Sequence, residues 1–268
     1  MLKESILIDS NENISHFSED ILKKAQERNL TIRLIGGLAV WLHCQKNRNI
    51  LKKFKRTIND IDFVGYLSEV IEVQKLFVDL GFVENKNIMR LFGRNRRIFY
   101  FPSSDLHIDL ILDKIHFCHD IDLTQRLKLD FPTITVSDLL ASKLQIFEIT
   151  KKDTLDIIAL LSEHNIGEID EETINVEYLS ELTSKDWGLW KTFNLNLKKT
   201  RKKLQDFIEG EKNISAVVFK IDTIVEDMNE RKKSISWKLR NIIGERIPWH
   251  NKVEELDRRQ LELPTSNN

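Results

Sequence analysis

Two carboxylates stand two residues apart on a predicted strand, within the segment 58–63. Side chains of a strand alternate between its faces, so Asp60 and Asp62 point the same way, while Ile61 and Phe63 point the other way. Like charges held side by side repel each other unless a cation lies between them. Mg²⁺ prefers oxygen ligands of this kind. Taken by itself, the pair also fits a surface turn in which only Asp62 belongs to the strand.

A glycine pair lies upstream of this strand. The β-type run 31–35 is followed by Gly36-Gly37 and then by the helix-like apolar segment 38–43. Glycine allows a ligand to approach the backbone closely, and the unpaired N–H groups of a helix start can face a phosphate. The order of strand, glycine pair and helix therefore predicts a phosphate-binding turn, with a plain tight turn as the alternative.

A third carboxylate lies on a later strand, predicted over residues 106–113, where apolar and polar residues alternate. The apolar face holds Leu106, Ile108, Leu110 and Leu112, and the opposite face holds His107, Asp109, Ile111 and Asp113. Such a strand can bring Asp109 beside the carboxylate pair of a neighbouring strand. The alternative is a half-solvated strand with ordinary surface acids.

A lysine interrupts the apolar face of the helix predicted over 137–149, for which Ser137 is the expected N-cap. Lys143 lies among leucines there, so it must reach solvent, form an ion pair or point into a site. The next predicted helix, roughly 152–163, places Asp153 and Asp156 on its core side. Two interpretations remain open. Either an ion pair fastens the two helices, or Lys143 reaches a triphosphate and the aspartates orient it.

The remaining elements follow from periodicity and turn residues. Helices are predicted over 15–29, with Ser18 as the cap, and over 68–80. Short strands are predicted over 82–83, 88–92 and 97–101, with residues 93–96 as a hairpin turn. The basic segment 44–57 is expected to be a loop or frayed helix, and Arg56, four residues before Asp60, could reach a phosphate.

The second half of the chain is predicted to be helical, over 173–184, 186–209, 213–232 and 234–244. We therefore expect an α+β fold, in which residues 1–136 form a mixed sheet with flanking helices. Residues 137–268 would form a helical C-terminal domain, whose first helix pair, 137–163, packs on the sheet domain. His116 and His119 lack the spacing of metal ligands, and we interpret them as structural.

Bulk composition narrows the class of protein. The chain has 268 residues, a formal net charge of −1 and two cysteines, Cys44 and Cys118. This balance argues against a strongly basic nucleic-acid-binding coat, and so few cysteines fit a reducing cytosol. The start lacks a signal-peptide pattern, and no run of about 18 apolar residues occurs. We expect a cytoplasmic protein that does not enter a membrane.

Together these elements resemble the polymerase-β-like nucleotidyltransferase superfamily, over roughly residues 30–163. Within it, the chain is similar to the bacterial branch of abortive-infection-type nucleotidyltransferase toxins. The matching features are the glycine turn, the two strands with carboxylates, an Arg-Thr lead into the first strand, and a Lys followed by a basic-Asp-x-x-Asp stretch. In this chain they are Gly36-Gly37, Asp60-Ile61-Asp62, Asp109, Arg56-Thr57, Lys143 and Lys152-Asp153-Thr154-Leu155-Asp156. Many members have Gly-Ser where this chain has Gly-Gly.

The resemblance implies transfer of a nucleoside monophosphate from an NTP to a hydroxyl, with release of pyrophosphate. Catalysis and binding of Mg²⁺ (Mn²⁺ being an alternative) would fall to Asp60, Asp62 and Asp109. The nucleotide and its phosphates would be held by Gly36, Gly37, Arg56, Thr57, Lys143, Asp153 and Asp156. The acceptor could be an RNA or tRNA end, a protein or a small molecule. A role as a toxin in a toxin–antitoxin or phage-defence system, with an antitoxin as partner, is also implied.

Two other readings compete with this one. The chain could be a catalytically inactive relative that acts as a binding or regulatory module, although a degenerate copy usually loses a carboxylate. The Asp60-Ile61-Asp62 motif could also be the nucleophile loop of a haloacid-dehalogenase-like phosphatase. That loop follows an apolar strand, and residues 54–59 are too polar for one.

Overall fold

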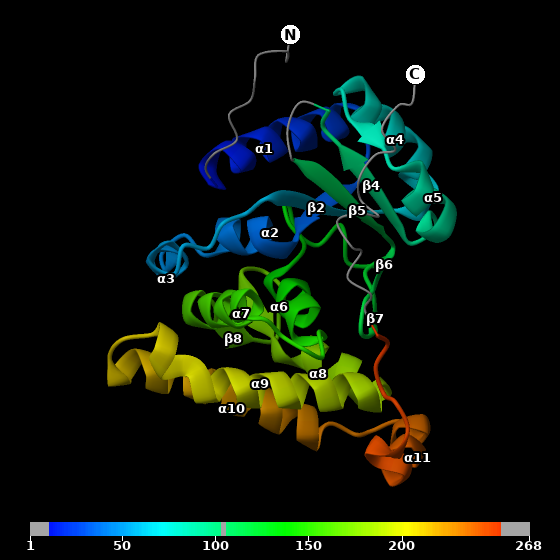
Figure 1. The fold of residues 1–268 in the computed structure, drawn as a ribbon. Coiled ribbons are helices and arrows are strands. Elements are labelled where there is room, and N and C mark those ends of the chain that lie inside the picture. Colours follow the sequence, from blue (N-terminus) through cyan, green and yellow to red (C-terminus); the bar gives the residue numbers. More distant parts are fainter. Residues whose placement is uncertain (1–10, 103–105, 253–268) are drawn as a thin grey trace.

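A five-stranded mixed sheet forms the centre of the first half of the chain (Figure 1), in a computed structural model that describes residues 11–102 and 106–252. The strand order is β1-β2-β5-β4-β3, and only the central pair, β2 and β5, runs parallel. The strands are β1 (Ile32–Ile35), β2 (Asp60–Gly65), β3 (Val83–Glu84), β4 (Arg96–Tyr100) and β5 (His107–Leu112). The expected α+β class, with a mixed sheet followed by a helical region, is confirmed.

Helices flank this sheet because their apolar residues recur at helical spacing. In α1 (Asn11–Glu27), Phe17, Ile21 and Leu22 are buried. Ser18 does not cap this helix, since it lies buried within it and donates to the Ser15 carbonyl. The other helical segments before β5 are α2 (Gly36–His43), α3 (Arg48–Lys53), η1 (Leu67–Glu69), α4 (Val70–Asp79) and α5 (Lys86–Phe92).

The predicted strand over 88–92 is wrong, because these residues belong to α5. Asn85 caps this helix, and its side chain accepts hydrogen bonds from the backbone N–H groups of Asn87 and Ile88. The predicted hairpin turn over 93–96 is wrong as well, since residues 93–95 connect a helix to a strand and Arg96 is already the first residue of β4. This shift turns Arg96 from a loop residue into one held by the sheet.

Two helices connect the sheet to the rest of the chain after the small antiparallel pair β6 (Lys114–His116) and β7 (Asp120–Asp122). They are α6 (Val136–Leu144) and α7 (Lys151–Glu163), and both contact α2. The N-cap of α6 is Thr135 and not Ser137, whose hydroxyl instead bonds the backbone of Thr173 and Asn175 in a neighbouring strand. The helix pair thereby connects α2, which packs against the sheet, to the helical half of the chain.

The helical half is a layer in which the long helices α9 and α10 lie side by side (Figure 1). Its first predicted helix begins later than expected, because residues 173–175 pair as a strand with residues 165–167. Its elements are β8 (Asn165–Gly167), β9 (Thr173–Asn175), α8 (Val176–Lys185), α9 (Trp187–Phe207), α10 (Glu211–Glu230), α11 (Ile235–Ile243) and η2 (Gly244–Arg246). None of the helices within residues 11–102 and 106–252 has the length and apolar character needed to cross a membrane.

Candidate functional site

The carboxylates of β2 and β5 share one face of the sheet. The two strands run parallel in a register that pairs Asp62 with Asp109 and Asp60 with His107. Residues paired across adjacent strands point to the same face, and so do residues two apart on one strand. Asp60, Asp62 and Asp109 therefore form one aspartate cluster, as the alternation predicts. Asp109 is buried and the other two are half-buried.

The glycine turn covers this cluster. Gly36 has a φ of +74°, which side-chain-bearing residues rarely adopt, and a Cβ there would overlap the Asp62 Oδ2 atom. A Cβ on Gly37 would overlap the Arg56 guanidinium. Both glycines are thus required by close approach of functional side chains to the start of α2. The turn and the two carboxylates of β2, some 25 residues apart in sequence, belong to a single site.

The electrostatics of the cluster centre on Asp62. Burial raises the pKa of Asp62 well above its usual range, and the negative charges of Asp60 and Asp109 raise it further. Lys143 and Arg96 act in the opposite direction. The negative charges around Asp62 therefore outweigh the positive charges of Lys143 and Arg96. A carboxylate in such surroundings takes up a proton or binds a cation.

Arg96 holds the third carboxylate. Its Nε lies 2.9 Å from each oxygen of Asp109, and its Nη2 lies 2.5 Å from Oδ2. Both Asp109 oxygens are therefore engaged by a guanidinium. Within the part of the chain that the structure describes, the aspartate cluster is not drawn together into a three-ligand metal group. Sequence reasoning missed Arg96 because it placed this residue in a hairpin turn.

A buried ion-pair network borders the cluster on the helix side. Asp156 is fully buried and accepts two hydrogen bonds from Arg56, at 2.9 Å from Nε and 3.0 Å from Nη2. Lys143 Nζ lies 2.9 Å from Asp156 Oδ2 and 3.3 Å from Asp153 Oδ1. Burial alone lowers the pKa of Lys143, but the two carboxylates outweigh it and the net shift is upward. Both cations are thus held in their charged form.

Two of the predicted site residues, Asp153 and Thr57, contact mainly residues close to them in sequence. Asp153 forms a capping box with Thr150 at the start of α7, in addition to its contact with Lys143. Thr57 is exposed, and its backbone carbonyl accepts a hydrogen bond from Arg56 Nη1 at 2.6 Å. The structure therefore joins Asp153 to the network through Lys143, and it joins Thr57 only through its backbone.

The histidines that the sequence analysis set aside have ordinary protein partners. The Nε2 atom of buried His119 lies 2.8 Å from Thr192 Oγ1, and burial lowers the pKa of His119 to about 4. His116 pairs with Asp120 on the exposed β6–β7 hairpin.

No family model matches this chain, and a search of curated proteins likewise finds no match. Function is therefore inferred from the chain's own residues.

Proposed function

We propose that this protein is a Mg²⁺-dependent nucleotidyltransferase, which moves a nucleoside monophosphate from an NTP to a hydroxyl acceptor. The observation that carries the proposal is the position of Asp62. This half-buried carboxylate lies beside Asp60 and Asp109, under a turn in which a Cβ at position 36 would overlap it. A structural carboxylate would not need so many like charges around it, whereas a metal ligand would.

The donor set suits a hard divalent cation. Asp60 and Asp62 offer oxygen ligands from one strand face, and they would hold Mg²⁺ or Mn²⁺. When bound, such an ion would supply positive charge that offsets the charge on the nucleotide phosphates and the leaving pyrophosphate. Asp109 is already engaged by Arg96 through both carboxylate oxygens, so a metal ion would compete with the guanidinium for this carboxylate.

The cationic side of the site suits the phosphates. Lys143 lies close enough to Asp62 to influence its pKa, and Asp156 fixes both Lys143 and Arg56. A charged group held in place before the substrate arrives stabilises developing charge without reorganising. The backbone N–H groups at the start of α2 would add donors to phosphate. In this assignment the aspartates of α7 position cations, so the paired and phosphate-binding interpretations of Lys143 are compatible.

A second candidate function is a nucleotide-binding or regulatory module without transfer activity. The Arg96–Asp109 contact favours this alternative. The Arg96 guanidinium already compensates the negative charge of Asp109, the carboxylate that would otherwise complete the metal-binding set. A toxin role, an antitoxin partner and a cytoplasmic location rest on the family resemblance described above.

Incubation of the full chain with each α-³²P NTP, Mg²⁺ or Mn²⁺ and total cellular RNA, protein extract or aminoglycosides tests the proposal. We expect one class of acceptor to be labelled by the wild type and not by Asp60→Asn or Asp62→Asn. Binding of NTP without labelling of any of these acceptors would favour the non-catalytic module.

A further inference from the structure

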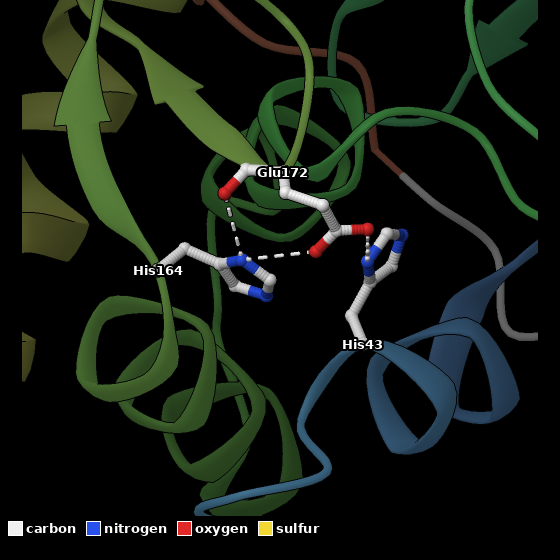
Figure 2. A group of neighbouring side chains, drawn as sticks. All are labelled: His43, His164 and Glu172. Atoms are coloured by element: carbon white, nitrogen blue, oxygen red, sulfur yellow. Dashed lines mark hydrogen bonds and ion pairs between the residues drawn. The ribbon is translucent and has the colours of Figure 1, made fainter.

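A second polar cluster lies at the opposite end of α2 from the glycine turn. It consists of His43, the last residue of α2, His164, which directly follows α7, and Glu172, in the connection between β8 and β9. Figure 2 shows both imidazole rings turned towards the Glu172 carboxylate. One ring nitrogen of each histidine and one carboxylate oxygen lie within 4.8 Å of one another. No motif in the sequence joins these residues, because His43 lies far along the chain from His164 and Glu172, which are eight residues apart.

The outer nitrogen of His43 is held by the Thr133 hydroxyl and by a backbone carbonyl. Its Nε2 lies 2.6 Å from Thr133 Oγ1 and 3.3 Å from the Ile134 carbonyl oxygen. A carbonyl only accepts hydrogen bonds, so Nε2 carries the hydrogen in the neutral ring. The inner nitrogen, Nδ1, then presents a lone pair to Glu172 Oε1 at 3.7 Å. Two acceptors facing each other call for a proton or a metal cation between them. An outer hydrogen bond that fixes the tautomer in this way is typical of histidines that bind metal.

The second histidine has an unsatisfied nitrogen. His164 is 5% exposed, and its Nε2 has no hydrogen-bond partner among the described residues. Its Nδ1 lies 3.5 Å from Glu172 Oε2 and donates a hydrogen bond to the Glu172 backbone oxygen at 3.1 Å, so the neutral ring has its lone pair on Nε2. Hydrogen bonding within the described part of the protein therefore leaves a lone-pair nitrogen of this buried ring without a partner.

We infer that His43, His164 and Glu172 bind a first-row transition metal ion, with Zn²⁺ as the best match. Imidazole nitrogens favour zinc and its neighbours, whereas Mg²⁺ favours oxygen ligands, so this site differs in chemistry from the aspartate cluster. Ligand atoms around tetrahedral zinc lie about 3.3 Å apart. One ring nitrogen of each histidine and one Glu172 oxygen already lie within 4.8 Å of one another, so small side-chain movements would complete the geometry. Such a site would leave a fourth position for water on the side where Glu172 is exposed.

The position of the proposed metal site indicates which parts of the fold a bound ion would connect. α2 carries the glycine turn at its start and His43 at its end, and α7 carries Asp156 before it reaches His164. A metal held by His43 and His164 therefore ties together the two helices that hold the turn and the buried carboxylate. The inference concerns binding and stability, and it stands whether or not the chain transfers nucleotides.

Zinc titration of the metal-free full chain tests this site, with bound metal measured directly and Co²⁺ absorption used to report tetrahedral nitrogen and oxygen ligands. We expect one Zn²⁺ per chain and a rise in melting temperature with zinc. Glu172→Gln and His43→Gln should lower zinc affinity by more than the roughly tenfold that loss of an outer-shell partner costs. Because the Glu172 side chain is 67% exposed, its variant folds even if the His43 variant does not.

The matched control is His116→Gln, which removes an exposed histidine that also pairs with a carboxylate. It should bind zinc like the wild type, and so should Asp62→Asn, which separates this site from the aspartate cluster. Absence of zinc binding by the wild type, or equal zinc affinity in Glu172→Gln and the wild type, would overturn the inference.

Discussion

The Gly36 backbone lies against the carboxylate of Asp62, so closely that a Cβ at position 36 would overlap Asp62 Oδ2. Gly36→Ala should therefore displace Asp62 in addition to straining a left-handed backbone. We expect loss of nucleotide binding together with a stability loss greater than the about 1 kcal/mol typical of such strain. Gly81→Ala is the control, because Gly81 also has a positive φ, of +93°, but its nearest neighbour, Phe101, lies at an ordinary 3.6 Å. Equal behaviour of the two variants in nucleotide binding would contradict the role of Gly36.

Arg96 and Asp109 provide a test of whether metal and guanidinium compete. Arg96→Gln leaves a buried carboxylate without its partner. We expect a loss of about 2 kcal/mol in unfolding free energy, below the range for fully buried pairs because Arg96 is partly exposed. Mg²⁺ should then raise the melting temperature of Arg96→Gln more than that of the wild type, because Asp109 is free to bind it. Arg97→Gln breaks the neighbouring pair with Glu84 and should show no such gain with Mg²⁺.

Asp156 joins two cations in the core, so its neutralisation should be costly. Asp156→Asn leaves Arg56 and Lys143 close together without the charge between them, and we expect a loss of about 3 kcal/mol in denaturant unfolding. Weaker NTP binding should accompany it, because both cations lose their fixed positions. Asp138→Asn is the matched control, since Asp138 is equally buried and pairs with Arg126 away from the site. If both variants weakened NTP binding alike, global destabilisation would be the cause.

The raised pKa of Asp62 predicts a specific pH dependence of stability. The folded state holds a proton on Asp62 at pH values where the unfolded chain, with an ordinary pKa near 3.8, has released it. Its contribution to stability is therefore fully present below that value and is lost as the pH rises through the raised folded pKa. Asp62→Asn should remove this decline, and its stability relative to the wild type should grow with pH. Mg²⁺ should flatten the wild-type curve. A difference between the two proteins that does not change with pH would contradict the assignment.

Much of the site follows from local patterns in the sequence. The alternation of residues 106–113 places Asp109 on the polar face of its strand, and the parallel register brings it beside Asp62. The charge and position of Lys143 on an apolar face likewise indicate an ion pair with the next helix, which the structure contains. These signals are local because strand and helix periodicity fix which way a side chain points.

Other features of the structure could not be predicted from local sequence patterns. Arg96 was missed because residues 88–92 are β-like in composition, and only Asn85, a good N-cap, signals the helix that shifts β4 by one residue. Ser137 resembles a cap, but a tertiary bond to the backbone of Thr173 takes its hydroxyl. The pairing of His43 with His164 depends on how two distant helices pack, and neither histidine has a local motif.

The position of the transferred label tests the central claim most directly. The full chain is incubated in parallel with α-³²P and γ-³²P forms of the same NTP, Mg²⁺ and the acceptor pool, together with Asp62→Asn. Asp122→Asn, on the exposed β6–β7 hairpin, serves as the control. Nucleotidyl transfer predicts that the α label appears in acceptor, that the γ label leaves as pyrophosphate, and that only the Asp62 variant loses both. Transfer of the γ label to acceptor, or α labelling that survives in Asp62→Asn, would contradict the account.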